Sequence, residues 1–351
     1  MKRVAIFMFT LALLAASASA LAAKEDKGEV VVFNWSEYIP NEVLQQFTDE
    51  TGIRVIYSTY ETNDAMYAKV KILQGKSYDL VCPSTYYTDL MIEEGLLTKF
   101  DHSKLPNLIN LDPKLMSLSF DPKNEYSIPY MWGTFGMIIN SKLTNKEHAK
   151  NWKDMLRPEY KGKVLLSDEM RDTFSIALHA VGKSANSTSE KDIREAYEFL
   201  RALHPSVRIF DVTATKQAFI SEEVVIGTTW NGDFIIAKQE NQDLEYVYPE
   251  DGALIWLDSF SMPKGAQNID NAHAFVNFLL RPEIAKKCQE EYMYSTPNLG
   301  TIALMTPEER NNVALVPTDK ELTKAEFVTN VGAKALLIYQ TYWEKLKSGV
   351  Q

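Results

Sequence analysis

Cysteine and histidine are scarce in this chain of 351 residues. The two cysteines, Cys82 and Cys288, have no metal-site spacing and allow at most one disulfide. An exported protein permits that disulfide, but the apolar strand before Cys82 and the helical pattern around Cys288 favour two buried, unpaired thiols. The five histidines are scattered over helical and loop segments. We therefore expect neither a metal site nor a catalytic histidine.

Several signature motifs are also absent. The sequence contains no glycine-rich phosphate loop, no Gly-x-Ser-x-Gly and no His-Glu-x-x-His. Positive charge is in deficit, because the formal net charge is −10 and removal of Lys2 and Arg3 with a leader would make it more negative. Nucleic acid and anionic ligands are therefore unexpected partners. We expect no cofactor and no enzymatic activity.

Long apolar runs are confined to the amino terminus. Lys2 and Arg3 precede an apolar run, 4–14, and small residues then lead to Ala18-Ser19-Ala20 or Ala20-Leu21-Ala22. This order is typical of a secretory signal peptide, which we place at 1–22. No cysteine follows the cleavage region, and no later apolar run is long enough to cross a membrane. The sequence predicts an exported, soluble protein without a lipid anchor.

The remaining chain alternates between strand and helix patterns. The β-branched run at 30–33 predicts a buried strand, 42–48 a helix, 54–58 a strand, 63–73 a helix and 78–82 a strand. Later patterns predict two short strands, 126–129 and 136–140, around an aromatic cluster, and a helical tail, 324–346. Alternating strands and helices predict an α/β fold with parallel, doubly wound sheets. The length predicts two domains.

Aromatic and acidic residues recur together at the predicted strand ends. Trp35 and Glu37 follow the first strand, Trp230 and Asp233 follow another, and Trp256 and Asp258 close a third. Ligands bind at the carboxyl ends of strands in such sheets, indoles attract cations, and carboxylates pair with ammonium groups. Any single pair also fits a core indole beside an acid at a helix start. The recurrence at distant positions favours a cation site.

A further acidic stretch begins at Ser167. Asp168, Glu169 and Asp172 follow within five residues. Ser167 fits a helix N-cap, and acids in a first helical turn are favoured by the helix dipole. Three carboxylates exceed what capping requires, so this stretch is a second candidate contributor to the cation site.

These residues resemble the periplasmic spermidine/putrescine-binding proteins of polyamine ABC transporters, closer to the spermidine-binding branch. The resemblance spans nearly the whole mature chain and is strongest at 34–38, 50–53, 63–69, 78–87, 121–129, 157–162, 230–232 and 296–299. It implies a type II periplasmic-binding-protein fold, in which two α/β lobes joined by crossing strands close on a ligand in the cleft. The implied lobes are 29–133 with 257–303, and 134–256 with 304–351.

The resemblance also implies a ligand-binding set. Glu169 and Asp172 have exchanged lengths relative to the spermidine binder, Val328 stands where that binder has a Gln, and Asp233 resembles an acid of the putrescine-type binder. The implied set is Trp35, Ser36, Glu37, Tyr38, Ser84, Tyr86, Glu169, Asp172, Trp230, Asp233, Trp256, Asp258 and Tyr294.

The expected function is capture of a polyamine in the periplasm, with spermidine, norspermidine or putrescine as ligand, and delivery to an inner-membrane ABC permease by a monomer. Some members of the family instead act as polyamine sensors for a membrane-bound cyclic-di-GMP enzyme, and binding residues alone do not separate the two roles. An exported hydrolase using paired carboxylates is a third reading, which rests only on the aromatic residues.

Overall fold

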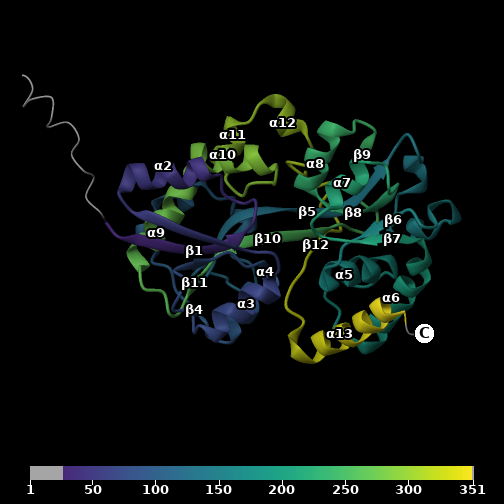
Figure 1. Cartoon of the computed structure of the whole chain (residues 1–351), viewed down its shortest axis with the longest axis horizontal. Helices are drawn as coiled ribbons and strands as arrows, with labels where there is room; N and C mark the ends of the chain where they lie inside the picture. Colours follow the sequence, from purple (N-terminus) through teal and green to yellow (C-terminus); the bar gives the residue numbers. More distant parts are fainter. Residues whose placement is uncertain (1–26, 350–351) are drawn as a thin grey trace, which may run out of the picture.

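The computed structural model describes residues 27–349, so the predicted signal peptide, 1–22, lies outside the described residues. Two main β-sheets lie side by side with helices packed around them (Figure 1). This arrangement confirms the predicted α/β class. In the part of the chain described, no helix is both long and apolar enough to cross a membrane.

The first sheet is parallel and has the strand order β2-β1-β3. Strands and helices alternate in it as the sequence predicts. Its elements are β1 (Glu29–Trp35), α2 (Asn41–Thr51), β2 (Arg54–Tyr60), α3 (Asn63–Ile72), β3 (Leu80–Val81) and α4 (Thr85–Glu93). Because β1 pairs directly with β3, the ends of these two strands are neighbours, which brings Trp35 and Ser84 to one edge of the sheet.

The second sheet has the order β12-β10-β5-β8-β6-β7, with β9 also paired to β5. Its strands are β5 (Ile128–Asn140), β6 (Val164–Leu166), β7 (Val207–Phe210), β8 (Ile226–Trp230), β9 (Leu244–Val247), β10 (Leu254–Phe260) and β12 (Glu326–Phe327). Its helices are α5 (Met170–Ala180), α6 (Glu190–Leu203), α7 (Thr215–Ile220), α8 (Asn231–Glu240) and α13 (Gly332–Ser348).

The remaining elements surround the two sheets. They are β4 (Leu97–Thr98), β11 (Met262–Pro263), α9 (Ile269–Leu279), α10 (Pro282–Tyr292), α11 (Leu299–Leu304) and α12 (Pro307–Asn311). Short 3₁₀ helices occur within 102–115, 146–160 and 204–206. Cys82 and Cys288 are both buried and unpaired, as the sequence favoured.

Local sequence explains where several helices begin and end. Thr62 caps α3 by accepting a hydrogen bond from the Ala65 amide, and Ser189 caps α6 in the same way. Gly52 ends α2 with a φ of 79°, a left-handed conformation that glycine adopts without steric cost. In α6 the buried residues recur at helical spacing and pack against α5 and α13.

The two strands predicted at 126–129 and 136–140 form one strand, β5, that also includes the aromatic cluster. The prediction of two separate strands, the first of which ended at Pro129, was therefore wrong. Pro129 has no amide hydrogen, but it pairs with Ser259, where the register between β5 and β10 shifts. The irregular pairing accommodates the proline, so the strand continues through it.

β5 and β10 pair antiparallel and run through the middle of the molecule, between the helices of the two ends (Figure 1). Trp256 and Asp258 lie inside β10, not at a strand end as the sequence suggested. The predicted lobe boundaries after residues 133 and 256 fall inside these two strands. The division into lobes stays a prediction, and two central strands connecting the halves are consistent with it.

The carboxyl-terminal tail also differs from its prediction. The helix expected over 324–346 is replaced by the short strand β12, a connecting segment and α13. β12 pairs parallel to β10, an interaction with a strand about seventy residues earlier that no local pattern reveals. The consequence for the site is that Val328, directly after β12, is placed beside the central strands.

Candidate ligand-binding site

A cavity of about 360 Å³ lies between the two sheets and contains every residue of the predicted ligand-binding set. The cavity is lined by Trp35, Ser36, Glu37, Tyr38, Ser84, Tyr86, Glu169, Asp172, Trp230, Asp233, Trp256, Asp258 and Tyr294, and also by Glu61, Asn63, Thr85, Val212, Thr213, Lys216 and Val328. Residues more than two hundred positions apart in the sequence thus share one cavity.

The loop after β1 supplies the first group of side chains. The indole Nε1 of Trp35 donates a 2.9 Å hydrogen bond to the carbonyl of Cys82, and this fixes the ring at the cavity edge. Glu37 has a φ of 55°, a left-handed conformation that is uncommon for a residue with a side chain. Its carboxylate stays largely exposed. Glu37 is therefore no helix-start acid, which was the alternative left open by the sequence.

The start of α4 supplies the second group, and Asn63 positions it. The Asn63 amide donates hydrogen bonds of 3.2 Å to both the Ser84 hydroxyl and the Tyr86 hydroxyl. Its carbonyl oxygen accepts from the Ser84 backbone amide at 3.1 Å. Asn63 is buried, so these contacts hold the two hydroxyls at the cavity wall.

Asp258 lies on β10 and lines the cavity, on the same strand face as Trp256 two residues earlier. Tyr38 donates a hydrogen bond to its Oδ2. Its Oδ1 and the Trp256 Nε1 are buried without a hydrogen-bond partner among the described residues. Burial raises the pKa of Asp258 to about 6, although the Tyr38 hydrogen bond and the nearby Ser84 hydroxyl oppose that rise. An unpaired buried acceptor at this position suits a donor from a ligand.

The start of α5 supplies a pair of acids. Burial and the charge of Glu169 raise the pKa of Asp172 to about 8, against the opposing charge of Arg171. Burial, with smaller contributions from Asp64 and Asp168, raises the pKa of Glu169 to about 7. Two neighbouring carboxyl groups in an enclosed cavity resist ionisation unless a cation joins them.

Ser167 does not cap α5 as the sequence predicted. The N-cap residue is Glu169, and the Ser167 hydroxyl accepts a 3.1 Å hydrogen bond from the Glu169 amide instead. The backbone of Ser167 is fixed by Thr228 and Thr173, its hydrogen-bond partners. The turn therefore starts two residues later than expected, and the Glu169 carboxylate is left to the cavity.

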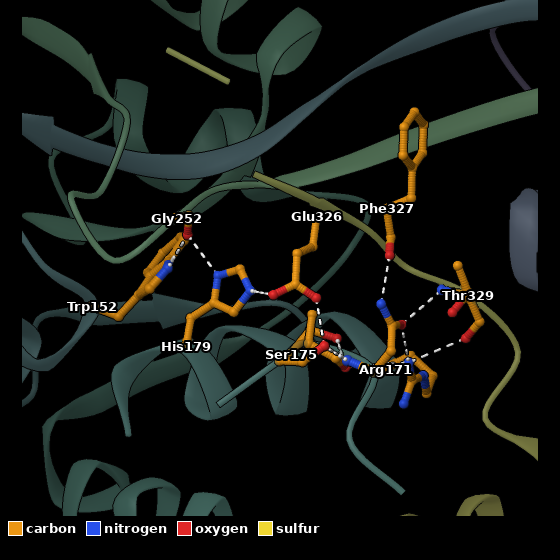
Figure 2. Close-up of polar contacts among 11 residues, drawn as sticks. Trp152, Arg171, Ser175, His179, Gly252, Glu326, Phe327 and Thr329 are labelled. Atoms are coloured by element: carbon orange, nitrogen blue, oxygen red, sulfur yellow. Dashed lines mark hydrogen bonds and ion pairs between the residues drawn. The ribbon is translucent and has the colours of Figure 1, made fainter. Parts of the chain in front are cut away.

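A polar network behind α5 holds the segment that carries Val328. Figure 2 shows His179 of α5 between the carbonyl of Gly252 and the carboxylate of Glu326, at 2.9 and 3.3 Å. Asn186 connects the same segment to Arg171, because its side chain accepts from Arg171 at 3.2 Å and from the Thr329 amide at 2.8 Å.

The Asn186 amide also donates a 2.8 Å hydrogen bond to the carbonyl of Phe327. The backbone on both sides of Val328 is therefore fixed to α5, the helix whose start carries Asp172. Val328 itself is buried and contributes an apolar stretch of cavity wall. This network therefore connects the segment that carries Val328 to the helix whose start carries Glu169 and Asp172.

The end of β8 and the start of α8 supply Trp230 and Asp233. Trp230 packs on Phe135 with ring centroids 5.1 Å apart. Burial raises the pKa of Asp233, and the nearby Lys216 offsets part of that rise. The Lys216 ammonium lies 3.2 Å from Asp233 and 3.5 Å from Glu37. Asp233 therefore already has a cationic partner, which the sequence did not indicate.

Aromatic rings form the apolar part of the cavity. The Tyr294 ring meets Trp256 edge-on at 5.2 Å and lies 5.8 Å from the Tyr38 ring. This packing requires glycine at position 232, because a Cβ there would lie 2.5 Å from the Tyr294 ring. The cavity wall therefore combines aromatic rings with carboxyl groups. Such a wall suits a flexible ligand that carries several positive charges.

Six cavity residues outside the predicted set were missed: Glu61, Asn63, Thr85, Val212, Thr213 and Lys216. Val212 and Thr213 follow β7, a strand that the sequence interpretation did not assign. Recognition of 207–210 as a strand would have drawn attention to its end and to Lys216 shortly after it. Asn63 sits at the start of a predicted helix and Thr85 at the start of α4, but buried polar positioning residues carry no separate signal.

The cavity contains six carboxyl groups and one ammonium group. Among residues 27–349, no cluster of three His, Cys, Asp or Glu side chains has an arrangement that could hold a metal ion. The chemistry offered is therefore that of charge-assisted hydrogen bonds and cation–π contacts.

The chain is similar to known periplasmic binding proteins over nearly its whole length. The chain is 44% identical over 341 residues to the spermidine/putrescine-binding periplasmic protein of Salmonella typhimurium, covering 96% of this chain and 98% of that protein. It is 30% identical to a putrescine-binding periplasmic protein of Escherichia coli K12, covering 96% of both chains. The predicted resemblance to spermidine/putrescine-binding proteins is confirmed.

A solved structure shows the same fold. The substrate-binding protein of a spermidine/putrescine ABC transporter from Streptococcus pneumoniae superposes with a TM-score of 0.82 at 35% identity, over 92% of this chain and 99% of that one. The family model for bacterial extracellular solute-binding proteins matches residues 42–315. This chain therefore belongs to the family of bacterial extracellular solute-binding proteins.

Proposed function

We propose that the protein captures a polyamine in the periplasm and delivers it to an inner-membrane ABC transporter. The ligand is spermidine or a close analogue such as norspermidine, or putrescine. The protein acts as a binding protein and not as an enzyme. The relatives named spermidine/putrescine-binding or putrescine-binding periplasmic proteins support this role.

The observation that carries the proposal is the unpaired Oδ1 of Asp258, buried in a cavity of acids and indoles. A buried carboxylate oxygen without a partner is costly, and a ligand ammonium offsets that cost through a charge-assisted hydrogen bond. Glu169 and Asp172 provide a second acid position, and their raised pKa values mark the same need for a cation. Methylene segments of the ligand would pack against Trp35, Trp230 and Trp256.

Closure of the two halves on the ligand follows from the same contacts. Tyr38 and Glu37 come from the loop after β1, whereas Glu169 and Asp233 come from helices over the second sheet. A ligand that touches both sets favours the arrangement in which they are close together. A single chain supplies the whole cavity, which supports action as a monomer.

The alternative role, a periplasmic sensor for a membrane-bound cyclic-di-GMP enzyme, gains no support. The relatives reported above carry the names of binding or transport proteins. No feature of the cavity favours signalling over transport. We therefore do not propose the sensor role.

Isothermal titration calorimetry tests the proposal. Spermidine, norspermidine, spermine, putrescine and cadaverine are titrated into the mature protein, with an amino acid and a disaccharide as controls. We expect one polyamine per chain and no heat from the controls. Absence of heat with all five amines, or tighter binding of a control, would overturn the proposed function.

A further inference from the structure

Lys216 stands apart from the other residues of the cavity. Among the cavity-lining side chains that the structure describes, it alone is a cation. It lies on α7, and its Nζ reaches Asp233 Oδ1 at 3.2 Å and Glu37 Oε2 at 3.5 Å. The two carboxylates come from opposite halves of the cavity, α8 and the loop after β1. Lys216 thus occupies the position of a ligand ammonium between them.

The ion pair between Lys216 and Asp233 is stabilised by its partial burial and by a further hydrogen bond. The Asp233 side chain is 9% exposed and that of Lys216 is 26% exposed, so solvent screens their interaction only in part. Burial lowers the pKa of Lys216, but the charges of Asp233 and Glu37 outweigh it and leave the pKa above its usual value. Thr215 donates a further hydrogen bond of 3.2 Å to Asp233. The carboxylate is therefore satisfied without a ligand.

Among the described residues, Glu169, Asp172 and Asp258 form no ion pair, although the charge of Arg171 offsets part of the rise in the pKa of Asp172. Tyr38 donates to Asp258, the Tyr38 ring lies 5.8 Å from the Tyr294 ring, and Tyr294 donates to Asp233 at 3.5 Å, so two tyrosines connect Asp258 to the Asp233 end that Lys216 fills. The acid pair Glu169 and Asp172 comes from a different element, the start of α5, and forms the other end of the cavity. A ligand meets free carboxyl groups at this acid pair and at Asp258, and an ammonium group of the protein beside Asp233.

We propose that Lys216 is a specificity-determining residue: its ammonium group takes one of the cation positions of the cleft and so limits how many ammonium groups the ligand brings. This inference rests on the proposed polyamine function and deepens it. Diamines and triamines fit the free positions at Glu169, Asp172 and Asp258. A tetraamine such as spermine has to place its last ammonium beside Lys216 or displace it, and like charges in a shared site repel.

The test compares ligand preference in the parent and in Lys216→Met, which keeps most of the length of the side chain and removes its charge. Calorimetry measures the dissociation constants of putrescine, spermidine and spermine, and the readout is the ratio of the putrescine value to the spermine value. We expect this ratio to rise at least fivefold in Lys216→Met. Lys334→Met, an exposed lysine on α13, controls for the loss of one positive charge and should leave the ratio unchanged.

A second comparison tests the part of Asp233. In the double variant Lys216→Met, Asp233→Asn the carboxylate that would receive the extra ammonium is gone, so the ratio should return toward the parent value. Lys216→Arg retains the positive charge and should keep the parent ratio. Thermal unfolding of every variant establishes that it is folded, and Lys216→Gln replaces any methionine variant that is not.

The results separate the two proposals. A ratio in Lys216→Met less than fivefold above the parent value, or the same gain in the double variant, overturns the role of Lys216. Equal changes in affinity for all three amines also overturn it, because they indicate a structural role alone. Failure of the parent to bind any polyamine overturns the proposed function instead.

Discussion

The Tyr38 hydroxyl donates a hydrogen bond to Oδ2 of Asp258 and joins the loop after β1 to the central strand β10 across 220 positions of the sequence. The bond engages one carboxylate oxygen and leaves Oδ1 without a partner among the described residues. The phenol thus orients the carboxylate toward the cavity. Asp258 is positioned from one side and available to a ligand from the other.

Asp258→Asn should weaken polyamine binding by roughly 2–5 kcal/mol, because a buried charge-assisted pair is lost. The amide has the shape of the carboxylate and can still accept from Tyr38 through its carbonyl oxygen, so the fold should be retained. Calorimetry measures the loss. Asp101→Asn, at an exposed position, is the matched control and should bind like the parent. Equal affinities of the two variants would contradict the assignment of Asp258.

Binding should strengthen as pH rises from about 6 to about 8. The ligand-free pKa values of about 6, 7 and 8 for Asp258, Glu169 and Asp172 mean that these groups hold protons in this range. A bound ammonium favours their ionised forms, so binding releases protons. The affinity for the polyamine then rises by up to about tenfold per pH unit for each proton released. Calorimetry at pH 7 in two buffers of different ionisation enthalpy counts the protons. Proton uptake, or affinity that falls with pH, would contradict this account.

The same groups predict how the stability of the ligand-free protein depends on pH. The carboxyl group of an aspartate in the unfolded chain has a pKa of about 4. Asp172 in the folded chain has a pKa of about 8. The folded state therefore binds more protons between these values, and the contribution of Asp172 to stability falls as pH rises through them.

Asp172→Asn should consequently reduce the loss of thermal stability between pH 5.5 and pH 8, measured by calorimetric unfolding without ligand. Asp243→Asn, which changes an exposed acid, serves as the control. An unchanged pH dependence in Asp172→Asn would show that the carboxyl group ionises in the folded protein as it does in water.

Asn186→Ala should destabilise the protein by about 1–3 kcal/mol, because Arg171, Phe327 and Thr329 lose hydrogen-bond partners. The segment that carries Val328 should loosen, so polyamine affinity should fall although Asn186 does not line the cavity. Denaturant unfolding and calorimetry measure the two effects. Gln45→Ala, which removes an exposed amide on α2, is the control. If Asn186→Ala changes stability and affinity as little as Gln45→Ala does, the network does not hold the cavity wall.

The first half of the fold could be predicted because its signals are local. β1, α2, β2 and α3 each carry their own periodicity and occur where the sequence placed them. Trp256 and Asp258 were assigned to a strand end as another aromatic and acidic pair like Trp35 and Glu37, whereas the structure places them inside β10. They reach the cavity because β10 crosses the centre of the molecule, which is a property of topology and not of local sequence.

The ion pair between Lys216 and Glu37 could not be predicted for a related reason. The two residues are 179 positions apart, and the contact depends on how the two halves of the molecule meet. A lysine on a short helix is ordinarily a solvated residue, and only the closed cavity gives it two carboxylates. The raised pKa values of Glu169 and Asp172 likewise arise from burial between the halves, which the sequence does not encode locally.

The central claim is that the carboxylates of this cavity hold the ammonium groups of a polyamine. A crystal structure of the mature protein with spermidine tests it most directly. We predict one ammonium nitrogen within about 3 Å of Asp258 Oδ1, another at the same distance from Glu169 or Asp172, and methylene groups against Trp256. Spermidine bound outside this cavity, or inside it with none of these three carboxylates within about 4 Å of a nitrogen, would contradict the account.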